Sequence, residues 1–93
     1  MRRIDWTTAF RRDLKREKKG QHKKTVEALV FGVVLLLAND KPLPEANRDH
    51  ALIGEWKDHR DCHIKPDLVL IYRLPDTTTL RLVRLGSHSA LFG

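Results

Sequence analysis

Residues 65–85 read KPDLVLIYRLPDTTTLRLVRL and predict two neighbouring β-strands. The run 68–74 is almost continuously apolar, which is typical of a strand buried on both faces. Residues 75–78 are rich in turn formers and predict a hairpin, after which residues 80–85 form the last strand. Because side chains alternate along a strand, Leu80, Leu82 and Arg84 are expected on one face of it.

The residues before this hairpin predict a further strand with one polar face. Lys57, His59, Asp61 and His63 alternate with Asp58, Arg60, Cys62 and Ile64. One face would therefore present lysine, histidine, aspartate and histidine in turn. Cys62 would point the other way, into the core, as a small hydrophobic residue.

The first half of the chain predicts one strand and two helices. Residues 3–6 suit a short strand, and Thr7 or Thr8 offers a cap for a basic helix from about Thr8 to Lys18. A second helix is expected from about Lys23 to Leu37, because its apolar residues form a wide stripe. Pro42 ends this helix, and residues 42–48 read as a loop.

This segregation of helices and strands favours an α+β fold. The N-terminal strand and the two helices would pack on an antiparallel sheet made by the later strands. The second helix would cover one face of the sheet, so the opposite face would be free to carry a polar site. A chain of 93 residues predicts one domain, residues 1–93, with a modest core and an open groove as its site.

Three features predict a cytoplasmic protein without a membrane partner. Cys62 is the only cysteine, so no intrachain disulfide is possible and a reducing compartment is expected. The longest apolar run, residues 28–38, falls short of the ~20 residues that a membrane span needs. The start of the chain lacks the apolar stretch of a signal peptide.

Positive charge is concentrated in the first 24 residues. The chain has a formal charge of +6, and residues 1–24 hold ten Lys and Arg against three acidic residues, a net of +7. Such an end suits a nucleic acid, an acidic protein or an anionic membrane, although a solvated helix face explains it equally well. If the partner is a nucleic acid, the cations that would contact its phosphates are Arg11, Arg12, Lys15, Arg16, Lys18 and Lys19.

The last 45 residues carry groups suited to acid–base chemistry on a phosphodiester. RNA can be cleaved without metal because its own 2′-hydroxyl is the nucleophile, so the protein must move two protons and neutralise the transition state. His50, His63 and Asp67 are candidate proton handlers, and His88 is another. Arg84 is a candidate phosphate clamp, since its planar fork matches phosphate oxygens, and Phe92 is a candidate base stacker.

Several of these residues also have purely structural interpretations. Arg84 would form a salt bridge with Asp61 or Asp67 if it had no substrate role. Trp56 suits packing better than base stacking, and Phe92 suits both. His59 and His63 provide only half of a zinc site, and no metal is expected. Ser87-His88 lacks the elbow motif of a hydrolase pair, and His22 and His59 are expected on the surface.

A longer pattern runs through the second half: DHALIGEWK at 49–57, RDCHIKPD at 60–67 and RLGSHSALF at 84–92. It resembles the YafQ branch of the RelE-like toxins, whereas the first half matches only in the order of its elements. The resemblance implies a compact α+β domain like the microbial ribonucleases. It implies a type II toxin that cuts mRNA on the 70S ribosome without a cofactor. It further implies a cognate antitoxin of the DinJ type with a ribbon-helix-helix, which would provide the only contact with DNA.

Carried over by motif, the resemblance implies a site of His50, His63, Asp67, Arg84, His88 and Phe92. His88 would be the general acid, while the base stays open among His50, His63 and Asp67. Asp67 would alternatively orient a histidine. Leu68 departs from the tryptophan found there in some members, which leaves the codon preference open. The competing hypothesis is a non-catalytic basic RNA-binding module that acts with its antitoxin as a transcriptional repressor.

Overall fold

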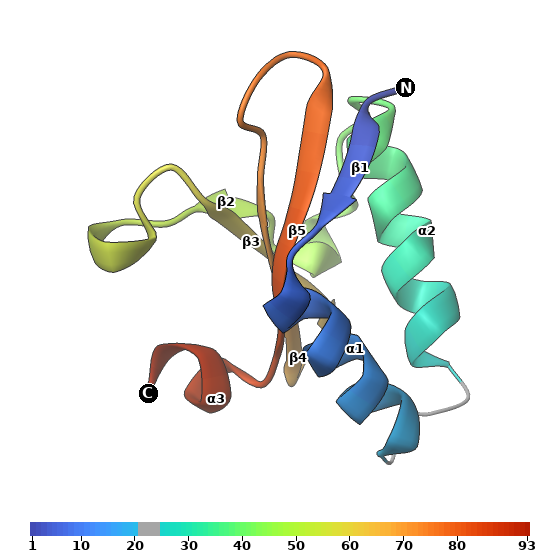
Figure 1. Ribbon diagram of the computed structural model, residues 1–93, viewed down its shortest axis with the longest axis vertical. Helices are drawn as coiled ribbons and strands as arrows, with labels where there is room; N and C mark the ends of the chain where they lie inside the picture. Colours follow the sequence, from blue (N-terminus) through green and yellow to red (C-terminus); the bar gives the residue numbers. More distant parts are fainter. Residues whose placement is uncertain (21–24) are drawn as a thin grey trace.

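The computed structural model describes residues 1–20 and 25–93, so His22 and the expected helix start at Lys23 lie outside the described residues. The chain forms a five-stranded sheet in the order β1-β5-β4-β3-β2 (Figure 1). The strands are β1 (Arg3–Trp6), β2 (His50–Ala51), β3 (Arg60–Lys65), β4 (Leu68–Arg73) and β5 (Thr79–Gly86). The helices are α1 (Thr8–Lys19), α2 (Val26–Ala38), the short α3 (His88–Phe92) and the 3-10 turns η1 (Glu45–Asn47) and η2 (Gly54–Trp56).

The α+β prediction is confirmed, but the sheet is mixed. Strands β3, β4 and β5 form the expected antiparallel meander, whereas β1 pairs with β5 in parallel. β3 begins at Arg60 and not at Lys57, because Asp58 has a φ of 71° and interrupts the strand. Within the segments expected to be irregular, the chain forms η1 and α3.

The two long helices cover one face of the sheet, as Figure 1 shows. Thr7 caps α1 by accepting a hydrogen bond from the Phe10 amide at 2.9 Å. The helices bury their apolar residues against the inward side chains of β3, β4 and β5, and Cys62 belongs to this main core as predicted. The opposite face carries only a small cluster around Val69, Ile71 and Leu91, so it remains available for polar groups.

A bulge in β5 changes which residues share a face. Ile71 pairs with Arg84 and Tyr72 pairs with Leu82, so Val83 is an extra residue in β5. Leu82 and Leu85 therefore both face the main core, and Arg84 lies on the opposite face with Ile71. The prediction that Arg84 shares a face with Leu80 and Leu82 is wrong, because it assumed unbroken alternation.

Beyond the end of β1, polar side chains of α1 and its cap satisfy the exposed edge of β5. The Thr7 hydroxyl donates to the Val83 carbonyl at 2.7 Å. The Leu85 amide donates to Asp13 at 3.0 Å, and Arg16 donates to the Leu85 carbonyl at 2.9 Å. An unpaired strand edge is thus closed by side chains where no neighbouring strand is present. Within the described residues, no helix is long and apolar enough to cross a membrane.

Candidate active site

The open face of the sheet presents a row of paired residues from four strands. His50 of β2 lies opposite Asp61 of β3, Asp61 lies opposite Ile71 of β4, and Ile71 lies opposite Arg84 of β5. Residues directly opposite one another on neighbouring strands point to the same face. The row therefore carries a histidine, a carboxylate and a guanidinium across one surface, with an apolar floor at Ile71.

A hollow of about 340 Å³ opens over this row. It is lined by His50, Leu52, Ile53, Trp56, Asp61, His63, His88 and Phe92. Four of the six residues expected in the site thus converge, although they come from β2, β3 and α3. Asp67 and Arg84 are not part of this lining. Asp61, which the sequence placed on the polar face of its strand but not among the six site residues, is part of it.

Asp61 provides a buried carboxylate at the base of the hollow. Its side chain is 3% exposed, and its Oδ1 lies 3.1 Å from Nδ1 of His50 without the alignment of a hydrogen bond. Among the described residues, this oxygen has no hydrogen-bond partner. Burial raises the pKa of Asp61, while the nearby histidines His50, His63 and His88 oppose that rise.

Hydrogen bonding to the loop before β2 determines the tautomer of His50. Its Nδ1 lies 2.8 Å from the carbonyl oxygen of Arg48, which can only accept, so Nδ1 carries the proton. In the neutral ring, Nε2 is then the nitrogen that can take a proton. Arg48 adopts a left-handed conformation with a φ of 48°, and this places its carbonyl beside the ring.

The same loop also fastens the strand that carries His63. The side-chain amide of Asn47 donates to the His63 carbonyl at 2.7 Å. Asp49 accepts hydrogen bonds from the Tyr72 hydroxyl at 2.5 Å and from Arg60 at 3.3 Å. Asp49 therefore anchors the loop before β2 to β3 and β4. The next residue, His50, is directed to the open face.

Helix α3 brings His88 and Phe92 to the hollow from the end of the chain. Ser87 caps it by accepting from the Ala90 amide at 3.1 Å, so this hydroxyl has a structural role. His88 and Phe92 are one turn apart, and their ring centroids lie 4.8 Å apart. Phe92 also meets Trp56 edge-on at 6.2 Å, so both rings pack together and line the hollow.

Arg84 is paired with a carboxylate that the sequence did not suggest. Its Nε and Nη2 donate to Asp13 of α1 at 2.6 and 3.2 Å. The expectation of a structural ion pair with Asp61 or Asp67 is therefore wrong about the partner. Asp13 lies 71 residues away along the chain, and only the packing of α1 against β5 brings the two together.

Comparison with known proteins identifies the family. The model of the family described as "Bacterial toxin of type II toxin-antitoxin system, YafQ" matches residues 2–93. The chain is a member of this toxin family. The "mRNA interferase toxin YafQ" of Escherichia coli (strain K12) is 42% identical over 92 residues, which span 99% of this chain and 97% of the relative.

Solved structures agree with this membership. The E. coli DinJ-YafQ toxin-antitoxin complex contains a chain that is 38% identical and has a TM-score of 0.85. The match covers 99% of this toxin and 98% of that chain. A copper-bound mutant toxin from Helicobacter pylori is 37% identical, with a TM-score of 0.86, and the match covers 99% of this toxin and all of that chain.

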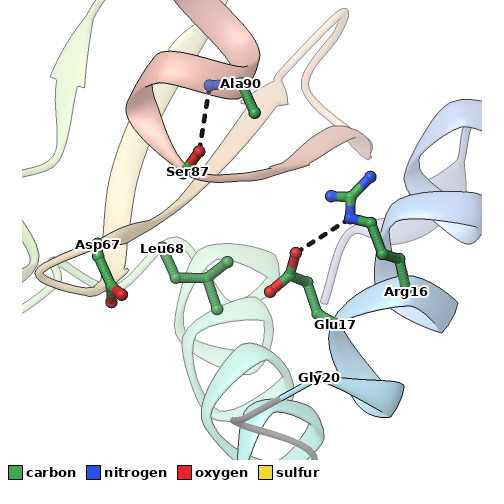
Figure 2. A pocket seen from close by; sticks show the side chains of 7 residues that line it. All are labelled: Arg16, Glu17, Gly20, Asp67, Leu68, Ser87 and Ala90. Atoms are coloured by element: carbon green, nitrogen blue, oxygen red, sulfur yellow. Dashed lines mark hydrogen bonds and ion pairs between the residues drawn. The ribbon is translucent and has the colours of Figure 1, made fainter.

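Asp67 does not line the histidine hollow but lines a second hollow of about 350 Å³. Figure 2 shows that hollow, with Asp67 and Leu68 on one side and Arg16 and Glu17 on the other. Ser87, the cap of α3, also lines it. Leu68 itself is 2% exposed and belongs to the main core, so the toxin presents no large ring to the histidine hollow at this position.

The cations of α1 fall into two groups. Arg11, Arg12 and Lys15 are exposed, and Arg11 lies over the Trp6 ring at 5.8 Å. Arg16 is also exposed, but it contacts Asp13, Glu17 and the Leu85 carbonyl with its three nitrogens. Lys18 forms an ion pair with Glu27 at 3.0 Å. Arg16 thus has a structural role that the sequence did not reveal.

Among the described residues, no set of ligands supports the alternative of a zinc site. Nδ1 of His59 contacts the Lys57 carbonyl at 3.1 Å, and its ring packs edge-on against Trp56. His59 does not line the hollow that contains His63. Across residues 1–20 and 25–93, no three histidine, cysteine, aspartate or glutamate side chains are placed to hold a metal ion.

Proposed function

We propose that this toxin cleaves messenger RNA on the ribosome by acid–base chemistry that needs no metal ion. Membership in the YafQ family and the curated relative's name support the coarse assignment, an endoribonuclease of the mRNA interferase kind in a type II toxin–antitoxin system. The observation that carries the mechanism is the hollow in which three histidines surround one buried carboxylate.

His50 is the best-placed general base. With the Nδ1 proton directed at the Arg48 carbonyl, Nε2 can accept the proton of the RNA 2′-hydroxyl. The freed oxygen attacks the adjacent phosphorus, and the bond to the 5′-oxygen of the next nucleotide breaks. Asp61 stabilises the imidazolium that forms, in the way that a buried carboxylate supports a catalytic histidine.

His88 is the general acid in this scheme. It donates a proton to the departing 5′-oxygen, so one proton is taken and one is returned in each turnover. The products are a 2′,3′-cyclic phosphate and a free 5′-hydroxyl. Phe92 and Trp56 set the His88 ring in place and offer a wall against which a base can lie.

The small size of the site supports a need for the ribosome. The hollow has a volume of about 340 Å³, so it is too small to bend an RNA strand into in-line geometry by itself. The exposed cations of α1 would hold ribosomal RNA through its phosphates and bring the hollow to a messenger already held in position. Arg11, Arg12 and Lys15 are the best placed for this role.

A DinJ-like antitoxin with a ribbon-helix-helix is the proposed partner. A related toxin chain is solved in the DinJ-YafQ complex, and its fold matches this one over almost the whole chain. The antitoxin would supply the contact with DNA. The toxin would enter a repressor complex only through it, and the toxin acts in the cytoplasm once released.

The test is primer extension on an mRNA under translation by purified 70S ribosomes. Wild-type toxin is expected to cut, and His50→Ala and His88→Ala are each expected to slow cleavage by about 10²–10⁴-fold. His59→Ala is the matched control, because His59 does not line the hollow, and it is expected to cut normally. Cleavage by His88→Ala at the wild-type rate would remove the acid assigned here.

Two further arms test the ribosome and the metal. The same RNA without ribosomes is expected to stay intact, and rapid cleavage of it would refute ribosome dependence. A chelator of transition metals that spares magnesium is expected to leave cleavage unchanged. Loss of cleavage with the chelator would overturn the metal-free mechanism.

A further inference from the structure

Arg84 is held in place by a buried carboxylate from a different element. We propose that Asp13 of α1 is a positioning residue for RNA cleavage: it fixes the plane of the Arg84 guanidinium so that one face of the fork meets the scissile phosphate. The inference rests on the proposed function, because it assumes that Arg84 binds that phosphate.

The buried carboxylate of Asp13 accepts more hydrogen bonds than an ion pair on the surface would require. Its side chain is 3% exposed. Oδ2 accepts from Arg84 Nε at 2.6 Å and from the Leu85 amide at 3.0 Å. Oδ1 accepts from Arg16 Nη1 at 2.9 Å and from Arg84 Nη2 at 3.2 Å. The carboxylate thus joins one helix to two positions of β5.

This environment keeps Asp13 ionised. Burial alone would raise its pKa, but hydrogen bonds from Arg84, the Leu85 amide and Arg16 outweigh that effect and lower it. A charged carboxylate forms a two-point pair with a guanidinium, which sets both the position and the plane of the arginine. The ion pair between Asp13 and Arg84 therefore holds the guanidinium in one orientation, unlike an exposed ion pair that forms and breaks.

The geometry leaves one side of Arg84 available. Its Nε and Nη2 are used by Asp13, whereas Nη1 has no hydrogen-bond partner in the described part of the chain. One third of the side chain, 33%, is exposed. Arg84 also shares the open face with Asp61, two strands away across Ile71, which corresponds to roughly 10 Å at the usual strand spacing.

That separation suits a nucleotide that spans the floor of the site. A nucleotide whose ribose lies in the hollow beside His50 and His88, and whose phosphate is directed across Ile71, would approach β5, the strand that carries Arg84. An arginine free to rotate would lose orientational freedom each time it bound this phosphate. Asp13 reduces this entropic cost, because it orients the Arg84 guanidinium before the substrate binds.

A structural role for Asp13 is the alternative, and activity must be separated from folding to exclude it. Asp13→Asn keeps the shape of the side chain but removes its charge. We expect single-turnover cleavage of ribosome-bound mRNA to fall at least tenfold, with little change in the toxin concentration that gives half-maximal rate. Asp5→Asn is the matched control, since Asp5 pairs only with exposed Arg3 among the described residues, and it is expected to cut normally.

The double variant decides between the two roles. If Asp13 acts through Arg84, adding Asp13→Asn to Arg84→Gln causes no further loss of cleavage. The melting temperature still falls in both backgrounds, because the Leu85 amide and Arg16 lose their charged acceptor regardless of residue 84. Independent, multiplicative losses of activity in the double variant would overturn the inference.

Arg84→Lys gives a second measurement that does not depend on how well Asp13→Asn folds. Lysine keeps the positive charge but cannot form the two-point pair that fixes a plane. Cleavage is expected to fall nearly as far as in Arg84→Gln, and a wild-type rate would overturn the inference. Failure of the wild-type toxin to cut would refute the proposed function itself, and the role of Asp13 would fall with it.

Discussion

Two buried aspartates of this toxin have opposite environments and opposite shifts in pKa. Asp13 accepts hydrogen bonds from two arginines and a backbone amide, and its pKa is lowered despite burial. Asp61 is equally buried, but its Oδ1 has no hydrogen-bond partner among the described residues, and burial raises its pKa. Ionised Asp13 therefore stabilises the fold. Ionised Asp61 destabilises the fold, and its carboxylate stays available to the site.

Replacing Asp61 should expose this conflict between stability and activity. Because its pKa is raised, folded Asp61 keeps its proton at a pH where the unfolded chain has lost it, so stability falls as pH rises above about 4. Asp61→Asn avoids that loss. We expect it to melt higher than wild type at pH 7 and to lose this advantage near pH 3, in calorimetric scans across that range.

The same variant is expected to cut ribosome-bound mRNA roughly 10²- to 10⁴-fold more slowly, because the His50 imidazolium loses the carboxylate that stabilises it. Asp40→Asn is the control, since Asp40 is exposed and pairs with Arg2 far from the hollow. Equal melting of wild type and Asp61→Asn at pH 7 would contradict the burial argument.

Sequence motifs identified residues that line the hollow. They did not identify the pair of Asp13 and Arg84, which only the packing of α1 against β5 brings together. His50, His63, His88 and Phe92 line one hollow, and all four belong to the motifs at 49–57, 60–67 and 84–92 that carry the resemblance. Arg84 could not be placed, since the bulge at Val83 shifts it to the opposite face. Asp13 has no local signal, because its partners are about 70 residues away.

At the scale of elements, the shortest pieces were the ones missed. Strand β2 has two residues, α3 has five and η1 has three, and none is long enough to show a periodic pattern. Each nevertheless holds or orients a histidine of the hollow. The long elements, α1, α2 and β4, were predictable because their apolar residues repeat over several turns or alternations.

Helix α3 is too short to be stable alone, so its cap should matter for the site more than for the fold. Ser87→Ala removes the acceptor of the Ala90 amide, a change that typically costs about 0.5–2 kcal/mol. We expect the Leu91 and Gly93 amides to exchange faster with deuterium and cleavage to slow several-fold, while the melting temperature changes little.

Ser87→Thr keeps a hydroxyl at this position and is the control for the cap, with near-normal exchange expected. Unchanged exchange in Ser87→Ala would show that the burial of Leu91 alone holds α3.

At the scale of the whole molecule, charge and chemistry occupy different surfaces. The cations proposed to contact RNA lie on α1, on the helix side of the sheet, and Figure 1 shows α3 on the opposite side. The histidine hollow is lined by His88 and Phe92 of α3. Ribosome attachment and RNA cleavage should therefore be separable by mutation. Paired replacement of Arg12 and Lys15 by alanine tests this.

Both residues are exposed, so their removal should leave the fold intact. If each contacts a ribosomal phosphate, the slope of log affinity against log salt should become shallower by about 1.4 to 1.8 in total. Ribosome binding measured by sedimentation at several salt concentrations gives this slope. Lys41→Ala, a single exposed cation beyond the end of α2, is expected to leave it unchanged. An unaltered slope in the double variant would place the ribosome contact elsewhere.

The parallel pairing of β1 with β5 links the beginning of the chain to its end. The sheet cannot form around β5 until residues 79–86 have been synthesised, and His88 is added later still. Until these residues are made, a nascent toxin therefore lacks β5, which joins β1 to the rest of the sheet, and His88, the proposed proton donor. Under the proposed mechanism, nuclease activity therefore requires synthesis of the chain through α3, so the message is translated at least that far before this copy of the toxin can cut it.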